Sequence, residues 1–163
     1  MSVKAAITMG LTITEVLELG VPFAQASNKD IVHNGLNKSQ TLEAWTTVPV
    51  TKHAAFQQAL AVGAATIDLR ALAGTQGAVD GNGLKVQAVM FRNPATNANA
   101  ITIAKGAANG YELLGAGWSI TLQPGQQVQL FLNDAAPDIA GGAKTMDLSG
   151  TLAQVLDCEI VMG

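Results

Sequence analysis

Hydrophobic and polar side chains alternate along most of this chain. Residues 7–14 read Ile-Thr-Met-Gly-Leu-Thr-Ile-Thr, with a large apolar side chain at every odd position. Because successive side chains of a β-strand point to opposite faces, this alternation predicts a strand with one buried face. Similar patterns predict strands at residues 84–91, 100–104, 118–122, 127–132 and 152–161, and shorter ones at 64–69 and 144–148. Residues 53–60 fit either a strand or a single helical turn.

Turn-forming dipeptides separate these segments. They are Asn34-Gly35, Asp80-Gly81, Asn82-Gly83, Asn109-Gly110 and Pro124-Gly125. Asn-Gly and Asp-Gly favour tight turns with positive φ, and Pro-Gly favours a turn between consecutive strands. No segment shows a sustained 3.6-residue period. The pattern predicts an all-β protein, a single-domain jelly roll or β-sandwich of about eight short antiparallel strands with an irregular N-terminal segment.

The first fifty residues do not show this alternation of hydrophobic and polar residues throughout. Residues 20–50 hold two prolines and scattered large apolar side chains without clear alternation. About thirty irregular residues are unusual inside a compact domain, so this stretch is either a long loop packed on the sandwich or an extended arm laid on a neighbour. We divide the chain into an N-terminal strand (1–19), an irregular arm or long loop (20–50) and a body (51–163), one domain overall.

The N-terminal residues imitate a secretory leader in part. Lys4 precedes a mostly apolar run, and Ala24-Gln25-Ala26 has the small residues of a cleavage site. Glu15 and Glu18 fall inside that run, however, and its longest uncharged stretch, residues 5–14, is far short of the ~20 residues that a membrane span needs. We therefore expect neither a cleaved leader nor a membrane segment.

Charged residues make up only 13% of the 163 residues, against about a quarter in a typical globular domain. The net charge is −3, and no cluster of Lys or Arg offers the basic surface that DNA or RNA binding requires. General acid–base catalysis needs positioned titrating side chains, and this chain has few of them. Many small, uncharged residues on short strands instead suit a surface that packs against a partner. We therefore predict a protein that is not an enzyme and binds no nucleic acid.

The residues capable of chemistry are few and scattered. Cys158, the only cysteine, alternates with Leu156 and Ile160 and is predicted to be a small buried hydrophobe. His33 and His53 lack further ligands at metal-binding spacing, so no metal site is predicted. No loop resembles a dinucleotide- or phosphate-binding motif, so no cofactor is predicted.

One loop allows a second interpretation of function. Tyr111 and Trp118 flank the end of a Gly/Ala/Asn-rich loop, and two such aromatic side chains can hold a sugar ring, with Asp134 as a polar contact. A core Trp beside a loop Tyr is the interpretation that we favour. A carbohydrate-binding jelly-roll module is therefore an alternative function, and a sandwich-fold enzyme is a third.

Several motifs in the second part of the chain carry a resemblance. The first runs from Leu84-Lys85-Val86-Gln87-Ala88 through Phe91-Arg92-Asn93-Pro94-Ala95-Thr96-Asn97-Ala98-Asn99 to Ile101-Thr102-Ile103. The others are Asn109-Gly110-Tyr111 with residues 115–125, Asn133-Asp134-Ala135-Ala136-Pro137-Asp138, and residues 142–151. Over residues 63–163 the chain resembles small structural proteins of tailed bacteriophages and prophages. The resemblance implies a virion component without catalytic residues, such as a capsid-decorating (cement) protein of jelly-roll type or a tail or baseplate protein.

The same resemblance implies partners and a location. A cement protein binds the major capsid protein and copies of itself, often as a homotrimer, on the outer surface of the virion capsid after synthesis in the host bacterial cytoplasm. It needs no membrane, nucleic acid or cofactor. Under this interpretation Phe23, Ile31, Val32 and Trp45 are the expected apolar anchors of the arm on its partner. The open alternative is that they cover one end of the domain's own core.

Overall fold

The computed structural model of the protein describes residues 2–17 and 29–163. Every regular element in these ranges is a β-strand, which confirms the predicted all-β class. The strands are β1 (Ala5–Met9), β2 (Ile13–Leu17), β3 (Lys29–His33), β4 (Lys38–Leu42), β5 (Lys52–Leu60), β6 (Ala64–Asp68), β7 (Leu72–Gly74), β8 (Gly77–Val79), β9 (Val86–Arg92), β10 (Ile101–Lys105), β11 (Ser119–Leu122), β12 (Gln127–Phe131), β13 (Thr145–Ser149) and β14 (Gln154–Met162).

Two compact units divide the chain. Residues 6–41 form the smaller unit, and residues 42–163 with the first five residues form the larger one, which we call the body. Lys4 precedes the smaller unit in the sequence and Glu43 follows it, and both belong to the body. Lys4 Nζ and Glu43 Oε1 form an ion pair of 2.9 Å. This division differs from the predicted single domain, whose body was expected to begin at residue 51.

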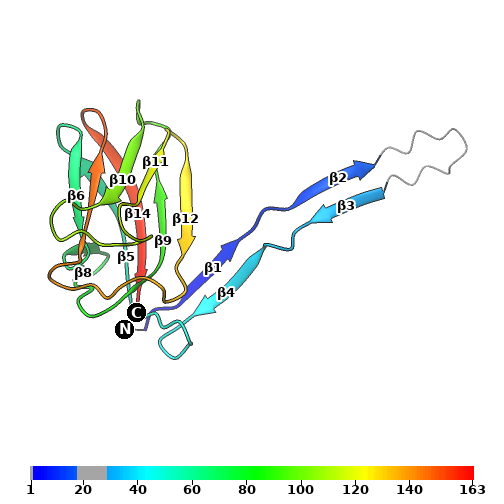
Figure 1. Ribbon diagram of the computed structural model, residues 1–163, viewed down its shortest axis with the longest axis horizontal. Helices are drawn as coiled ribbons and strands as arrows, with labels where there is room; N and C mark the ends of the chain where they lie inside the picture. Colours follow the sequence, from blue (N-terminus) through cyan, green and yellow to red (C-terminus); the bar gives the residue numbers. More distant parts are fainter. Residues whose placement is uncertain (1, 18–28) are drawn as a thin grey trace, which may run out of the picture. The chain divides into compact units, whose positions relative to one another are not determined.

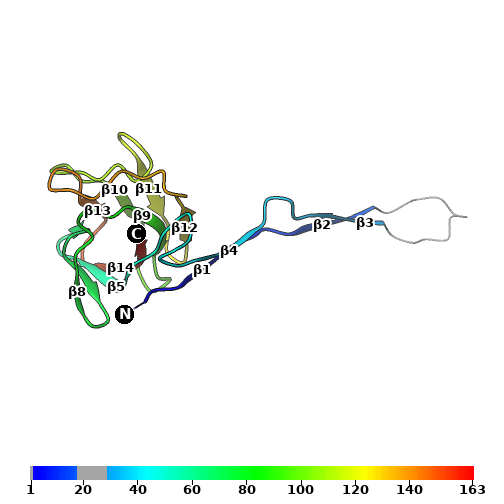
Figure 2. The ribbon, with the colours of Figure 1, turned by 90° about the horizontal axis from the view of Figure 1, so that it is seen from below.

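The body is a β-sandwich of two four-stranded antiparallel sheets (Figure 1). One sheet has the strand order β12-β9-β14-β5, and the other has the order β11-β10-β13-β6. Figure 2 looks along the strands of the body and shows the sheets as two layers. The short hairpin of β7 and β8 lies beside β5.

The pairing in the body is that of one long hairpin rolled up on itself. β10 pairs with β11 at the tip, and outward from the tip β9 pairs with β12, β6 with β13, and β5 with β14. Rolling also brings β14 beside β9 and β13 beside β10. The first and last strands of the sandwich are therefore neighbours, although Gln57 and Asp157, which lie opposite each other, are 100 residues apart.

In both sheets, the apolar residues of the alternating sequence pattern lie on the inner face, towards the other sheet. In one sheet Cys158 on β14 lies between Phe91 on β9 and Phe56 on β5. In the other, Ile103 lies opposite Leu148, and both are buried. Alternation along each strand thus separates a packed face from an outer one, as the sequence pattern predicts.

The strands predicted for the body are present, each within two residues of its expected ends. Residues 53–60 belong to strand β5 and not to a helical turn, because this segment pairs with β14 along its whole length. The β7–β8 hairpin was not predicted. Its strands are three residues each and consist mainly of Ala and Gly, which leaves too short a pattern to detect.

The N-terminal residues differ from the prediction. The strand expected over residues 1–19 is two strands, β1 and β2, while β3 and β4 lie within residues 20–50, for which no regular structure was predicted. β1 pairs with β4, and β2 pairs with β3. In the β2–β3 pair the large apolar side chains of both faces are exposed, so its sequence need not alternate as a sandwich strand does.

The Pro124-Gly125 turn forms as predicted, but it joins strands of different sheets. Gln126 N donates a hydrogen bond of 2.9 Å to Gln123 O, and Gly125 has a φ of 83°. A proline followed by a residue with positive φ fits a type II turn. The chain leaves β11 in one sheet and enters β12 in the other, so the turn is a corner of the sandwich.

Candidate functional site

The β2–β3 ribbon, which consists of residues 13–17 and 29–33, places two of the predicted partner contacts on opposite faces. Directly paired residues share a face, and Ile31 lies opposite Glu15 while Val32 lies opposite Thr14. Ile31 therefore shares one face with Ile13, and Val32 shares the other with Val16. Phe23, the remaining contact predicted in this unit, lies outside the described residues.

Both faces of this ribbon are open to solvent. Ile13, Val16, Ile31 and Val32 are all exposed, and so are Leu11 and Leu36 in the flanking segments. A lone two-stranded hairpin is marginally stable at best in water. Since complete burial of an aliphatic side chain contributes about 1.5–3 kcal/mol, covering these half-exposed side chains would stabilise a complex by roughly 1 kcal/mol each. The ribbon is thus a candidate docking element.

Trp45, the third predicted contact in the described residues, is presented by a tightly bonded turn of the body. The Thr46 hydroxyl lies 2.7 Å from Glu43 O and 2.6 Å from Val48 O, one of which accepts its single proton, and it accepts a bond from Glu43 N at 3.1 Å. The Trp45 residue is 78% exposed. A large aromatic side chain held in place by a fixed backbone loses little entropy on binding, which is typical of an interface anchor.

The two aromatic residues predicted to contact a glycan are buried. Tyr111 is fully buried and Trp118 is 7% exposed, and both belong to the core of the body. The indole Nε1 of Trp118 donates to Tyr111 O at 2.8 Å. Aromatic faces buried in this way are not available to stack on a sugar ring at the surface. Trp118 therefore lies in the core, as the favoured interpretation expected, and Tyr111, which was expected only as a loop residue, is buried in the core as well.

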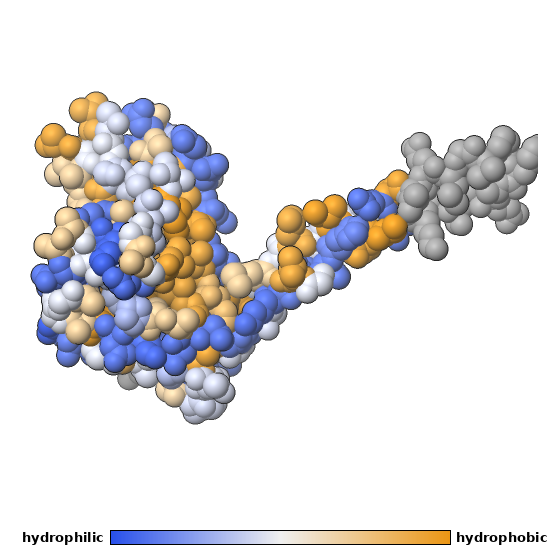
Figure 3. Space-filling model, viewed as in Figure 1, coloured by the Kyte–Doolittle hydropathy of each residue, from blue (hydrophilic) through white to orange (hydrophobic). Residues whose placement is uncertain are grey.

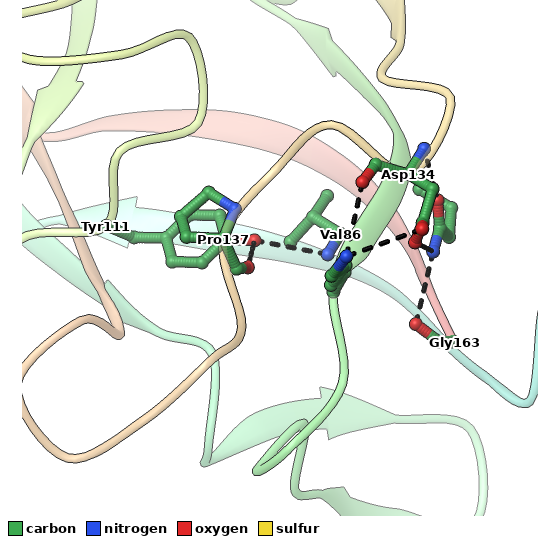
Figure 4. A network of polar contacts seen from close by, with 7 residues as sticks. Val86, Tyr111, Asp134, Pro137 and Gly163 are labelled. Atoms are coloured by element: carbon green, nitrogen blue, oxygen red, sulfur yellow. Dashed lines mark hydrogen bonds and ion pairs between the residues drawn. The ribbon is translucent and has the colours of Figure 1, made fainter.

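Asp134 belongs to a polar network that fastens the loop after β12 to β9 (Figure 4). The side-chain amide of Gln87 donates to Asp134 Oδ1 at 3.1 Å, and Asp134 N donates to Gln87 Oε1 at 3.0 Å. The hydrogen bond from Gln87, with a further one from Lys85, holds the pKa of Asp134 below its usual value. This carboxylate is therefore ionised and engaged at neutral pH, which suits a structural role.

The hydroxyl of Tyr111 anchors the same loop at a second point. It donates to Pro137 O at 2.7 Å and accepts a bond of 3.2 Å from Val86 N (Figure 4). Burial raises the pKa of Tyr111 to about 12, so the phenol keeps its proton. Val86, Tyr111 and Pro137, from three separate segments of the sequence, thus meet in the fold and hold the loop that follows β12.

Most other ionisable side chains form surface ion pairs. Lys144 Nζ lies 2.6 Å from Asp68 Oδ2, and Arg92 Nη2 lies 2.6 Å from Asp157 Oδ2. His33 Nε2 and Glu15 Oε2 are joined by a hydrogen bond of 3.1 Å. Burial alone would raise the pKa of Asp68, but its bonds to Lys144 and to the Arg70 amide hold it below the usual value. No cluster of three metal-ligating side chains occurs within residues 2–17 and 29–163, and no helix in those ranges could span a membrane.

Cys158 is buried on the inner face of β14, which confirms its predicted place in the core. Burial, with a smaller contribution from the charge of Asp157, raises the pKa of its thiol to about 12. Because the thiolate is the reactive species, the thiol is inert in the folded protein.

We expect Cys158 of the folded protein to stay unlabelled by a thiol reagent at pH 8, under conditions that label it fully in denaturant. Mass spectrometry of samples quenched over time measures this. Equal labelling rates with and without denaturant would contradict the buried position of the thiol.

An apolar hollow of about 480 Å³ lies at the surface of the body, between the loop before β11 and the loop after β12. Its apolar lining includes Leu113, Leu114, Phe131, Leu132, Ala136 and Pro137. Leu113 and Ala136 are buried, whereas Leu114 is 48% exposed. Glu112, the charged residue of the lining, is bound to Lys105 Nζ at 2.5 Å. Figure 3 shows apolar surface gathered along β12.

The hollow was not predicted from the sequence. Leu113-Leu114 and Ala135-Ala136-Pro137 are separated by 20 intervening residues and meet only through the folding of two loops. Comparison of the chain with protein-family models, with curated proteins and with solved structures finds no match. The candidate site is thus defined by geometry alone: two exposed apolar elements, Trp45 and the β2–β3 ribbon, and one apolar hollow.

Proposed function

We propose that this protein is a non-enzymatic structural component of a bacteriophage virion, a decoration (cement) protein that binds the outer surface of the capsid and stabilises the shell. Its partners are then the major capsid protein and copies of itself, in a homotrimer. It is made in the host bacterial cytoplasm and resides on the virion. The proposal involves no nucleic acid, membrane or cofactor.

Exposed Trp45 is the observation that carries this proposal. A fixed turn holds an indole in solvent, and such a side chain gains most when a partner surface covers it completely. Ile31 and Val32 add apolar contacts from the smaller unit. Among the described residues the ionisable groups form ion pairs and hydrogen bonds rather than a constellation of acid and base, which also favours binding over catalysis.

The pairing order of the body supports the jelly-roll part of the proposal. A jelly roll is a long antiparallel hairpin wound into two sheets, and the nested pairs from β10–β11 out to β5–β14 fit that description. This architecture places turns and strand edges at the surface, among them the turn that presents Trp45. It therefore suits a protein that lies on another protein.

The mechanism would be thermodynamic linkage. A ligand that binds only the assembled state stabilises that state, so a protein that spans neighbouring capsid subunits raises the free energy needed to separate them. Copies linked in one oligomer engage several sites at once, which increases the overall affinity without any new contact.

Co-sedimentation with expanded capsid shells tests the proposal. We expect the full chain to pellet with shells and to raise their resistance to heat, and the emission of Trp45 to shift to shorter wavelength as the indole is covered. Trp118 is already buried and provides a constant background. Shells that bind no protein, or particles in which imaging places the protein on the tail, would contradict the capsid assignment.

A further inference from the structure

We propose that Asn34, in the turn between β3 and β4, is a site of spontaneous deamidation at which the folded protein turns asparagine into isoaspartate or aspartate. Asparagine is a thermolabile residue type, and the reaction consumes only water. It places a carboxylate in the smaller unit and makes the net charge of −3 more negative by one. The reaction is independent of the shell function proposed above, because it takes place within a single chain.

Deamidation joins the asparagine side chain to the next backbone nitrogen. Gly35 N loses its proton and attacks Asn34 Cγ, so a nitrogen–carbon bond forms. The bond from Cγ to Nδ2 breaks, and Nδ2 takes up that proton and leaves as ammonia. Water then opens the cyclic imide and supplies the oxygen of the new carboxylate. Opening at the backbone carbon gives isoaspartate, opening at Cγ gives aspartate, and no atom is oxidised or reduced.

Three Asn-Gly dipeptides occur in the chain, at residues 34–35, 82–83 and 109–110. Glycine after the asparagine favours this reaction, because it has no Cβ to crowd the attacking nitrogen. All three asparagines are exposed, so access of water does not distinguish them. The difference between the sites is whether the glycine nitrogen is free and whether the asparagine backbone can rotate to bring this nitrogen to Cγ.

The dipeptide at residues 82–83 is held by hydrogen bonds on both sides. Gly83 N donates to Ile139 O at 2.9 Å, so the nitrogen that would attack is already engaged. Asn82 N donates to Asp80 Oδ1 at 2.9 Å, which fixes the residue from its other side. Reaction at Asn82 therefore requires a local opening of the body, and such an opening costs free energy.

The dipeptide at residues 109–110 is fixed through the asparagine carbonyl. Asn109 O accepts hydrogen bonds from Lys144 N at 2.7 Å and from Thr145 N at 3.0 Å. Gly110 packs so closely on Gly106 that a Cβ would collide with its carbonyl oxygen. Rotation of the Asn109 backbone would break both bonds and this packing, so this site is also protected by the fold.

The dipeptide at residues 34–35 has neither restraint. Gly35 N forms no hydrogen bond with any residue in the ranges 2–17 and 29–163, and a Cβ on Gly35 would have open space around it. Asn34 O accepts one turn bond, of 3.0 Å, from Asn37 N. Figure 2 shows this turn looping out between β3 and β4, and Leu36 at its tip is 97% exposed. The turn can therefore rotate at little cost.

Ageing of the full chain in mildly alkaline buffer made with heavy-oxygen water tests the proposal. After digestion in ordinary water, mass spectrometry finds the heavy oxygen only in carboxylates formed during ageing. We expect Asn34 to react at least about tenfold faster than Asn82 and Asn109, since an opening that costs ~1.4 kcal/mol slows a reaction tenfold. In denaturant the three sites should react at similar rates.

Two glycine variants provide matched controls. Gly35→Ala should slow the reaction at Asn34 at least about tenfold, because a Cβ crowds the attacking nitrogen, and the open space around Gly35 lets the fold accept it. Gly142→Ala makes the same change in another open turn and should leave the rate unchanged. Isoelectric focusing should show a more acidic form that accumulates in the original protein and is absent from Asn34→Gln.

Three results would overturn the proposal. The first is reaction of Asn82 or Asn109 as fast as Asn34 in the folded protein. The second is a folded state that slows Asn34 as strongly as the other two sites. The third is a rate at Asn34 that Gly35→Ala leaves unchanged. Shell binding is measured on fresh protein, so its outcome and this one are independent.

Discussion

Replacing Asn93 with alanine is expected to lower the free energy of unfolding by roughly 2–4 kcal/mol. The Asn93 side chain is fully buried at the end of β9. Its amide donates to Leu122 O at 2.8 Å and to Asn99 O at 3.1 Å, and its Oδ1 accepts from Asn97 Nδ2 at 2.6 Å. Each of these three bonds contributes about 0.5–1.5 kcal/mol, and alanine removes all of them.

The bonds of Asn93 hold several elements at one corner of the sandwich. They tie the β9–β10 loop to the end of β11, and Asn97 continues to Val155 O on β14 at 2.6 Å. For a chain of this size, the expected loss corresponds to a fall in the melting temperature of roughly 5–15 °C, which calorimetry measures. Asn99→Ala is the matched control, because Asn99 is exposed and bonds through its backbone oxygen. A similar loss in both variants would show that the side-chain network is not the cause.

Replacing Trp45 with alanine is expected to weaken binding to capsid shells at least about thirtyfold, which corresponds to the ~2 kcal/mol of an interface hot spot. The same change should leave the free energy of unfolding within about 0.5 kcal/mol of its original value, because an exposed side chain contributes little to the fold. The turn that presents Trp45 is held by Thr46 and backbone groups, and alanine keeps these.

Titration of shells with each variant, followed by sedimentation, measures this effect. Leu152→Ala removes a comparably exposed apolar side chain from another turn of the body and should bind as the original protein does. Undiminished binding of Trp45→Ala would rule out the turn as an anchor. Weakened binding of both variants would indicate a general loss of apolar surface and not a specific contact.

The sandwich strands could be predicted from the sequence because each has one packed face. Along β14, Leu156, Cys158 and Ile160 point to the core and alternate with Asp157 and Glu159 on the outer face. Because only one face of each strand is buried, apolar residues recur at every second position of its sequence. The strand ends followed from Gly, Pro and Asn, whose backbone preferences are local.

The partners of the strands could not be predicted in the same way. Alternation fixes which face a residue occupies but carries no information on which strand lies beside it. Pro124-Gly125 illustrates this: its turn chemistry is plain in the sequence, but nothing local distinguishes a hairpin turn from a corner that changes sheet. The pairing of β5 with β14 depends on segments at opposite ends of the body.

The candidate site was only partly predictable. Exposed Trp45, Ile31 and Val32 stand out as large apolar residues in a segment without sandwich periodicity, and the structure leaves them in solvent. Strands β3 and β4 were missed because an open ribbon imposes no alternation. The hollow was missed because Leu113 and Pro137 lie on separate loops that meet only in three dimensions.

The rolled hairpin also determines the order in which the body can form during synthesis. Among the described strands, β5 pairs with β14 alone, and β9 lies between β12 and β14. A ribosome-bound chain that lacks β14 can close the β10–β11 tip but leaves β5 without its paired strand, although the β7–β8 hairpin lies beside it. Distant pairings of this kind fold in milliseconds to seconds. We therefore expect the nascent body to acquire protease resistance only once β14 has emerged from the ribosome and paired with β5 and β9.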